Sequence, residues 1–262
     1  MTMTKSNYFF LLISVTFYSL YVDWFTETER FHSMKEIPSS EKKGGISGEV
    51  VTVQIQDDAP KLEIEIAGAP EHLTWNTQVR YTISVSDPKD GVSRYGEIDG
   101  RSCLMEIEYF PAGEELQMNE AIKTKEEHKG LSLMKRSTCF GCHADKTRLA
   151  GPSFAEIAAR YKNNPGTAEE LGSHVINGSS GIWGSQMMPS HPDLSLEEAA
   201  QIAGYILEQG RNKNRWIYPG LEGTFRIIEK PADREQGIYV LTASYTSTSN
   251  IRGEQSVAYK IK

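Results

Sequence analysis

Residues 139–143 read Cys139-Phe140-Gly141-Cys142-His143, and this C-x-x-C-H string is the attachment pattern of a c-type haem. Each thiol adds across one vinyl group of the porphyrin, and the two intervening residues set the thiols about one vinyl-to-vinyl distance apart. The histidine that follows lies under the ring, where its neutral imidazole reaches the iron as proximal ligand. The pattern therefore predicts one covalently attached haem c, held by Cys139 and Cys142, with His143 as an iron ligand.

Other interpretations of the two cysteines are weaker. A structural zinc needs four ligands, usually from two pairs, and the remaining cysteine, Cys103, stands alone in the sequence. A dithiol redox site is expected at the start of a helix in a βαβ pattern, which does not surround residues 139–143. A disulfide across so short a loop would leave His143 unexplained. Cys103 lies in an apolar, strand-like run and is interpreted as a small buried hydrophobic residue.

Length and charge limit the number of domains and the class of partner, and the N-terminal segment indicates the cellular location. The 262 residues suffice for one large or two small domains, and the net charge of −7 gives no basic field for nucleic acid. Lys5 precedes an apolar run from Tyr8 to Val22, which is typical of a secretory signal, although bulky residues replace the small-x-small cleavage site. With Trp24 and Phe25 the run approaches the ~18 residues of a membrane-spanning helix. Residues 1–25 are therefore predicted to be either a removed signal peptide or an uncleaved inner-membrane anchor, and both alternatives place the rest of the chain in the periplasm.

Two β regions are predicted, and a polar linker at 26–47 precedes the first. Residues 48–112 alternate apolar and polar positions in several short runs separated by turns, which favours an immunoglobulin-like sandwich. One of the turns carries Asp87 and Asp90. A plain turn is favoured there over a calcium site, because two carboxylates are too few for a calcium shell. The alternation returns in residues 222–262, a C-terminal β segment that we expect to pack on the first sandwich or on the helical region.

The region between the β segments is predicted to be helical. Residues 113–128 are interpreted as a linker and residues 129–210 as a small all-helical domain around the haem motif. Ser153 is a predicted helix cap, and two capping boxes open further helices. These boxes pair Thr167 with Glu170 and Ser195 with Glu198. The expected fold class is therefore α+β and multidomain, with an all-α cytochrome c domain flanked by an Ig-like β-sandwich and C-terminal β-strands.

A methionine in a glycine-rich loop is the best candidate for the second iron ligand. A low-spin electron carrier needs a ligand on the other face of the iron, and a thioether raises the reduction potential compared with a second imidazole. Met188 directly precedes Pro189, whose ring fixes the backbone that presents the sulfur. Met187 and His191 are the alternatives, and the competing role for Met187 is packing in the core. We predict His143 and Met188 as the two metal ligands.

Three strings carry a resemblance to a known family: the C-x-x-C-H pentapeptide, Gly151-Pro152-Ser153-Phe154, and the stretch from Asn177 through Trp183 to Met188-Pro189. In this order and spacing, over about 80 residues, they look like the short single-haem class I bacterial cytochromes c. The resemblance implies that the carbonyl of Pro152 accepts the Nδ1 hydrogen of His143. It also implies that Trp183 donates its indole hydrogen to a haem propionate and that His174 lies near a propionate.

The flanking regions resemble a larger arrangement. The string from Tyr81 to Gly91, Met-Pro-Ser-His-Pro in the helical region and the string from Leu241 to Thr246 are similar to a cytochrome c module. That module is often appended to pyrroloquinoline-quinone-dependent sugar dehydrogenases of Bacteroidetes and their relatives. The dehydrogenase propeller is absent from this sequence, so the resemblance implies the electron-transfer part only.

These observations predict a periplasmic cytochrome that carries single electrons between redox partner proteins, such as a donor dehydrogenase and a terminal oxidase. An enzyme of the dihaem peroxidase type would need a second C-x-x-C-H, which the sequence lacks. The alternative is a haem-containing sensor or an adhesion protein whose β domains carry the main function. Basic residues outnumber acidic ones early in the helical region, and they form either a docking face for an acidic partner or a merely solvated surface. The basic residues are Lys135, Arg136, Lys146, Arg148, Arg160 and Lys162.

Overall fold

The chain divides into two units, Met1–Gly45 and Ile46–Lys262, of which only the second is described below. The predicted signal or anchor at 1–25 and the linker at 26–47 lie outside the described residues. Within the part of the chain that is described, no helix is both long and apolar enough to cross a membrane. A computed structural model describes residues 49–51, 58–123, 127–161, 164–232 and 236–262.

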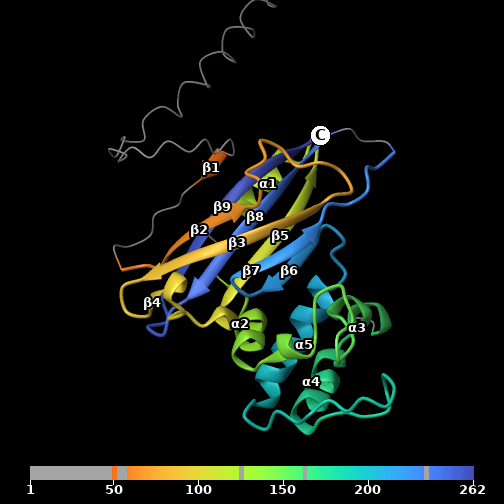
Figure 1. Cartoon of the computed structure of the whole chain (residues 1–262). Coiled ribbons are helices and arrows are strands. Elements are labelled where there is room, and N and C mark those ends of the chain that lie inside the picture. The colour runs from red at the N-terminus through yellow and green to blue at the C-terminus, as the bar shows by residue number, and fades with distance from the viewer. Residues whose placement is uncertain (1–48, 52–57, 124–126, 162–163, 233–235) are drawn as a thin grey trace, which may run out of the picture. The chain divides into compact units, whose positions relative to one another are not determined.

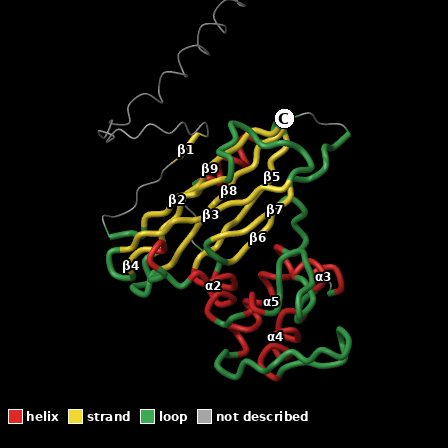
Figure 2. The backbone as a smooth tube through the Cα atoms, viewed as in Figure 1, coloured by secondary structure: helices red, strands yellow, loops and turns green. Residues whose placement is uncertain are grey.

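The second unit contains two antiparallel sheets (Figures 1 and 2). One sheet has the strand order β1-β9-β8-β5-β6, and the other has the order β2-β3-β4 with β7 also paired to β3. The strands are β1 (Glu49–Val51), β2 (Lys61–Ile66), β3 (Gln78–Asp87), β4 (Gly91–Val92), β5 (Cys103–Pro111), β6 (Arg215–Pro219), β7 (Glu222–Arg226), β8 (Gly237–Thr246) and β9 (Arg252–Ile261).

The pairing of the strands corrects the predicted fold class. Strand β5 lies between β6 and β8, so that Ile107 is opposite both Trp216 and Leu241. In the other sheet, β7 pairs with β3 and places Phe225 opposite Val79. The expected α+β layout, a complete Ig-like domain and a cytochrome c domain followed by a flanking C-terminal segment, is therefore wrong. The unit is strand-rich with few helices, and the strands after the helical region are integral parts of both sheets.

The core between the sheets explains why these strands assemble. Strand β3 alternates strictly, with Val79, Tyr81, Ile83 and Val85 buried and the intervening polar residues exposed. Such alternation gives each sheet one apolar face, and burying that face against the other sheet is the main source of stability. Tyr239 of β8 is fully buried in this core. Its ring lies 5.1 Å from Tyr109, 6.3 Å from Trp216 and 6.3 Å from Phe225, measured between centroids.

The helices gather beside one end of the sheets, except for α1 (Figure 1). Leu131, Leu133 and Met134 of α2 are buried. Leu104 of β5 and Ile217 of β6 belong to the same buried cluster, so the first sheet contributes to the helical core. The helices are α1 (Glu115–Ile122), α2 (Lys129–Arg136), α3 (Phe154–Arg160), α4 (Thr167–Asn177) and α5 (Leu196–Gln209), with short 3₁₀ turns at η2 (Ser93–Tyr95), η3 (Gly100–Ser102) and η4 (Cys139–Gly141).

Reciprocal capping boxes begin two of the described helices. Ser153 with Glu156 caps α3, and Ser195 with Glu198 caps α5, each as a reciprocal capping box. The capping box expected from Thr167 is not formed, because α4 already begins at Thr167. Its cap is Gly166, whose φ of 86° is a left-handed conformation that glycine adopts at little cost.

The turn that carries Asp87 and Asp90 is held by hydrogen bonds. Asp87 accepts from the backbone N–H groups of Lys89 and Asp90. Asp90 accepts from the Tyr245 hydroxyl at 2.7 Å and from the Thr248 N–H at 2.7 Å, so its carboxylate fastens the turn to the end of β8. Among the described residues, no group of three or more His, Cys, Asp or Glu side chains is placed to hold a metal ion. Both carboxylates therefore have a structural role in the turn.

Candidate functional site

The C-x-x-C-H segment forms one tight turn, η4. The backbone N–H groups of Cys142 and His143 both donate to the Cys139 carbonyl, at 3.2 and 3.0 Å. Thr138, which precedes the turn, has a φ of 59°. The turn brings both thiols and the imidazole to the same cavity. Cys139 is partly buried, and burial raises the pKa of its thiol to about 11.

The His143 ring is held in one tautomer. Its Nδ1 lies 2.6 Å from the Pro152 carbonyl oxygen, and because a carbonyl only accepts, Nδ1 must carry the hydrogen and donate it. Nε2 is then left as the nitrogen with a free lone pair, which is the form that binds a metal. The ring is only 9% exposed and stacks on Phe154, with centroids 5.9 Å apart and planes 19° from parallel.

Gly151 makes room for the same ring. A Cβ placed on Gly151 would lie 2.5 Å from Cε1 of His143, closer than side chains pack. We expect Gly151→Ala to displace the imidazole and to lower the free energy of unfolding by about 1–3 kcal/mol, as overpacking does. Gly141→Ala is the matched control, since a Cβ there meets nothing within 4 Å. Thermal denaturation of the haem-loaded variants measures the effect, and equal stability of the two variants would contradict the tight packing at Gly151.

A short backbone bridge positions the methionine loop. The N–H of Met188 donates to the Ser179 carbonyl at 2.8 Å, and the N–H of Ser179 donates to the Met188 carbonyl at 3.1 Å. Gly178 allows this approach, because a Cβ on it would lie 2.8 Å from the Met188 oxygen. Met188 is partly buried, whereas Met187 is 66% exposed. His191, the other alternative, is not among the residues that line the cavity in the described part of the chain.

One apolar cavity of about 260 Å³ brings the predicted site residues together. Its walls include Phe154 and Ile157 of α3, Leu171 of α4 and Ile202 and Ile206 of α5. Apolar walls with two thiols, an imidazole and a thioether are a donor set that fits a haem attached through thioethers. The predicted residues that line the cavity are Cys139, Cys142, His143, Pro152, His174, Trp183 and Met188.

Two arginines lie against Trp183. The guanidinium of Arg160 is 4.6 Å from the centroid of the indole, and that of Arg148 is 5.6 Å away. Arg160 also donates to the Ile182 carbonyl at 2.9 Å, and Arg148 pairs with Glu156 at 2.9 Å. Arg148 lines the cavity, a placement that the sequence reasoning missed. Its only signal in the sequence was its position in the loop between the haem motif and Gly151.

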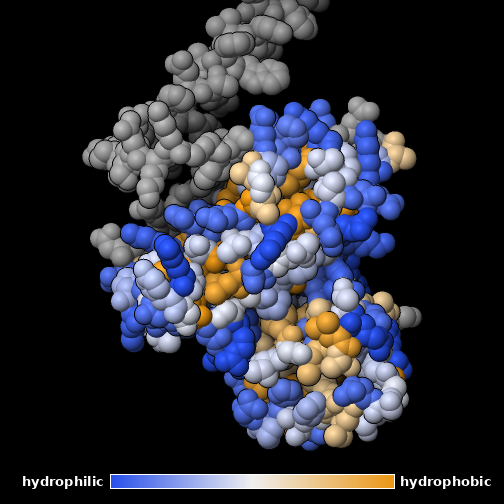
Figure 3. All heavy atoms as spheres, in the orientation of Figure 1, coloured by the Kyte–Doolittle hydropathy of each residue, from blue (hydrophilic) through white to orange (hydrophobic). Residues whose placement is uncertain are grey.

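The group of basic residues that the sequence suggested does not form a single exposed face. Lys135 is buried against Glu127, with Nζ 2.7 Å from the carboxylate oxygen. Lys146 donates to the Asn212 carbonyl at 2.6 Å, and Lys162 lies outside the described residues. On the side seen in Figure 3, apolar residues gather over the helical part of the unit instead.

Known proteins are similar to the region that contains the cavity. The family described as cytochrome C oxidase, cbb3-type, subunit III matches residues 125–206. Cytochrome c-551 of Ectopseudomonas mendocina is 37% identical over 78 residues, which cover 30% of this chain and 94% of that protein. The chain belongs to the cytochrome c family. Its domain of this family is class I and monohaem, and the cofactor is one covalently attached haem c with its iron.

Further relatives match the same cytochrome c domain. Cytochrome c-552 of Nitrosomonas europaea is 36% identical over 75 residues, covering 29% of this chain and 73% of that protein. The crystal structure of wild-type Nitrosomonas europaea cytochrome c552 is similar at 35% identity with a TM-score of 0.28, covering 29% of this chain and 95% of that one. These matches leave the β strands on either side without a counterpart in the relatives named.

Proposed function

We propose that the protein is a periplasmic single-haem cytochrome that carries single electrons and is not itself an enzyme. The supporting observation is the convergence of both thiols, His143 and Met188 on one apolar cavity. In this proposal Cys139 and Cys142 would hold the haem, and His143 and Met188 would supply the ligands of its iron. Two protein ligands leave no open position at the metal for a substrate, which favours a carrier.

The proposal assigns tasks to the haem, to His143, to Met188 and to the apolar walls of the cavity. The haem supplies one-electron Fe(II)/Fe(III) chemistry when bound. The Nδ1–H to Pro152 bond at 2.6 Å fixes the orientation of His143 and increases the basicity of Nε2. The apolar walls exclude water and so limit the reorganisation that accompanies a change of charge. The half-buried Met188 is presented by its bridge to Ser179.

The polar residues of the cavity are assigned to the propionates. Trp183 and His174 both line the cavity. We assign the indole N–H of Trp183 as a propionate donor and place His174 near a propionate, as the family resemblance implies. Arg148 and Arg160, stacked on Trp183, add positive charge at the same place, which favours a bound carboxylate.

The cellular setting belongs to the same proposal. Residues 1–25 act as a signal peptide or as an inner-membrane anchor, and the cytochrome c domain spans residues 129–210. The partners are redox proteins, with a dehydrogenase of the pyrroloquinoline-quinone class as a candidate donor and a terminal oxidase as a candidate acceptor. This part rests on the sequence of the N-terminal segment and on the resemblance of the flanking regions.

Carbon monoxide distinguishes this carrier from a haem sensor. We expect the reduced, haem-loaded protein to bind carbon monoxide hardly at all at neutral pH, because Met188 as an iron ligand would have to be displaced by the gas. The absorption spectrum of the reduced protein, recorded before and after addition of the gas, measures this. Fast and complete conversion to a carbonyl complex would reject the carrier and favour a sensor with an open iron.

A further inference from the structure

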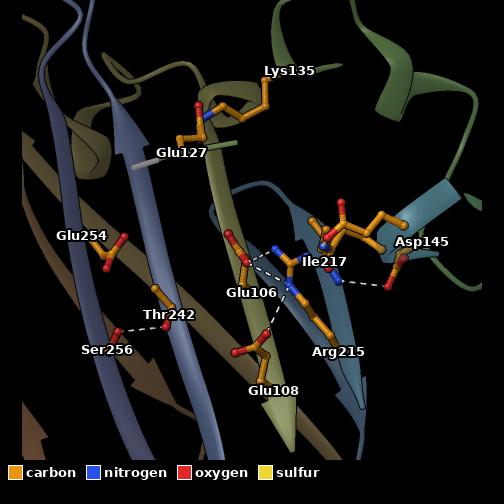
Figure 4. A network of polar contacts seen from close by, with 12 residues as sticks. Glu106, Glu108, Glu127, Lys135, Asp145, Arg215, Ile217, Thr242, Glu254 and Ser256 are labelled. Atoms are coloured by element: carbon orange, nitrogen blue, oxygen red, sulfur yellow. Dashed lines mark hydrogen bonds and ion pairs between the residues drawn. The ribbon is translucent and has the colours of Figure 1, made fainter. Parts of the chain in front are cut away.

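The haem-binding loop lies against the outer strand of a sheet. Strand β6 is at the end of the order β1-β9-β8-β5-β6, so among the described strands it has a neighbour in that sheet on one side only. Asp145, two residues after His143, accepts from the Ile217 N–H of this strand at 3.2 Å (Figure 4). Asp145 is only 6% exposed. A strand from the β part of the unit therefore reaches the segment that carries the proximal histidine.

The contact between Asp145 and Ile217 offsets two free-energy costs, that of a buried N–H and that of a buried carboxylate. An N–H on the free side of an edge strand costs free energy if it is buried without an acceptor. A buried carboxylate is costly as well unless donors surround it. The Ile217 N–H provides one donor to Asp145, and Nζ of Lys146 lies 3.7 Å from the same carboxylate oxygen. The Ile217 N–H and the mostly buried Asp145 carboxylate thus satisfy each other.

The same loop segment is tied to the helices. The backbone carbonyl of Asp145 accepts from the Ala155 N–H at 3.0 Å, and the carbonyl of Ala144 accepts from the Phe154 N–H at 3.0 Å. Phe154 is the residue on which the His143 ring stacks. Asp145 is therefore bonded to α3 through its backbone and to β6 through its side chain, with the proximal histidine beside it.

Strand β6 is itself held firmly at this place. Arg215, at the start of β6, pairs with Glu106 and lies 3.5 Å from Glu108, both on β5 (Figure 4). Its guanidinium also donates to Gln209 at the end of α5 and lies 5.9 Å from the ring centroid of Tyr205. Breaking a buried ion pair of this kind is strongly unfavourable. The position of Ile217 is thus fixed relative to both the sheet and the last helix of the cytochrome c domain.

We propose that Asp145 is a positioning residue through which edge strand β6 fixes the haem-binding loop, and with it the orientation of His143. The β strands then act as a second support for the cofactor site, in addition to the helices. This inference rests on the proposed function, because it concerns the geometry of an iron ligand.

The test compares two substitutions in the full-length, haem-loaded protein. Asp145→Asn keeps a side-chain oxygen that can accept from the Ile217 N–H, whereas Asp145→Ala removes the acceptor. We expect Asp145→Ala to lower the melting temperature by roughly 3–8 °C and Asp145→Asn to leave it within about 2 °C. The haem-methyl proton resonances of the oxidised protein, which report ligand orientation, should move in the alanine variant and return close to wild type in the asparagine variant.

Asp193→Ala is the control for stability, since Asp193 is an exposed carboxylate of the same helical region and its loss should leave the melting temperature nearly unchanged. Equal melting temperatures and equal resonances in the asparagine and alanine variants would overturn the role of Asp145. A wild-type protein that contains no haem would instead overturn the proposed function, so the two failures are distinguishable.

Discussion

Met188→Ala should abolish the weak charge-transfer band of an Fe(III)–sulfur bond, near ~695 nm, and lower the midpoint potential. The reason is that a thioether stabilises Fe(II) relative to Fe(III), and the variant has only water or a weaker ligand to replace it. Met188 is suited to this role because it is half-buried in the cavity. Both its backbone N–H and its carbonyl are hydrogen-bonded to Ser179. Absorption spectroscopy and a redox titration of the oxidised variant measure both effects.

Met187→Ala is the matched control for this experiment. The two methionines are adjacent and chemically identical, and both line the cavity, but Met187 is 66% exposed. Its loss should leave the band intact and the potential nearly unchanged. If the two variants exchanged these behaviours, the assignment of Met188 as iron ligand would be wrong.

Deleting residues 222–262 should prevent the β part of the unit from folding. The deletion removes β7, β8 and β9, and with β8 it removes the strand that lies next to β5. It would expose the apolar face of both sheets, including the positions opposite Leu241 and Phe225. We expect the loss of cooperative thermal unfolding and the binding of a hydrophobic dye. A truncated protein that kept the wild-type melting profile would contradict the topology.

A single substitution in β8 tests its contribution to the core with a smaller perturbation than the deletion. Tyr239→Ala removes a fully buried ring of β8, and its hydroxyl also accepts from the Ile228 N–H at 3.1 Å. The loss should lower the free energy of unfolding by about 3–5 kcal/mol, the usual effect of truncating a buried aromatic residue to alanine. Tyr95→Ala is the control, because Tyr95 is 73% exposed and its loss should cost little. Equal denaturation midpoints for the two variants would place Tyr239 outside the core.

The candidate site was predictable because its signals are local. Cys139 and His143 are joined by a turn whose hydrogen bonds span only a few residues. Met188 was indicated by the proline that follows it, and the backbone bridge to Ser179 is formed with the same glycine-rich stretch. Spacing over such short distances can be read from the sequence without knowing how the rest of the chain folds. All seven predicted residues line one cavity.

The arrangement of the strands was less predictable, because it depends on pairs far apart in the sequence. Alternation showed that residues near Ile107 and near Leu241 form strands, but nothing local indicates that these two residues face each other across β5 and β8. The predicted surface position of one charged residue is wrong for a related reason, since burial also depends on a partner elsewhere in the chain. The sequence predicts Lys135 on a solvated or docking surface, yet its side chain is buried beside Glu127. A partner of opposite charge removes the cost that normally keeps lysine at the surface.

A redox titration of the full-length protein, followed through its haem absorption, tests the central claim most directly. If Cys139, Cys142, His143 and Met188 hold one haem as an electron carrier, the reduced and oxidised spectra should interconvert reversibly. The titration should follow a single one-electron curve whose amplitude corresponds to one haem per chain. Absence of haem absorption, two resolved steps or irreversible conversion would contradict the account.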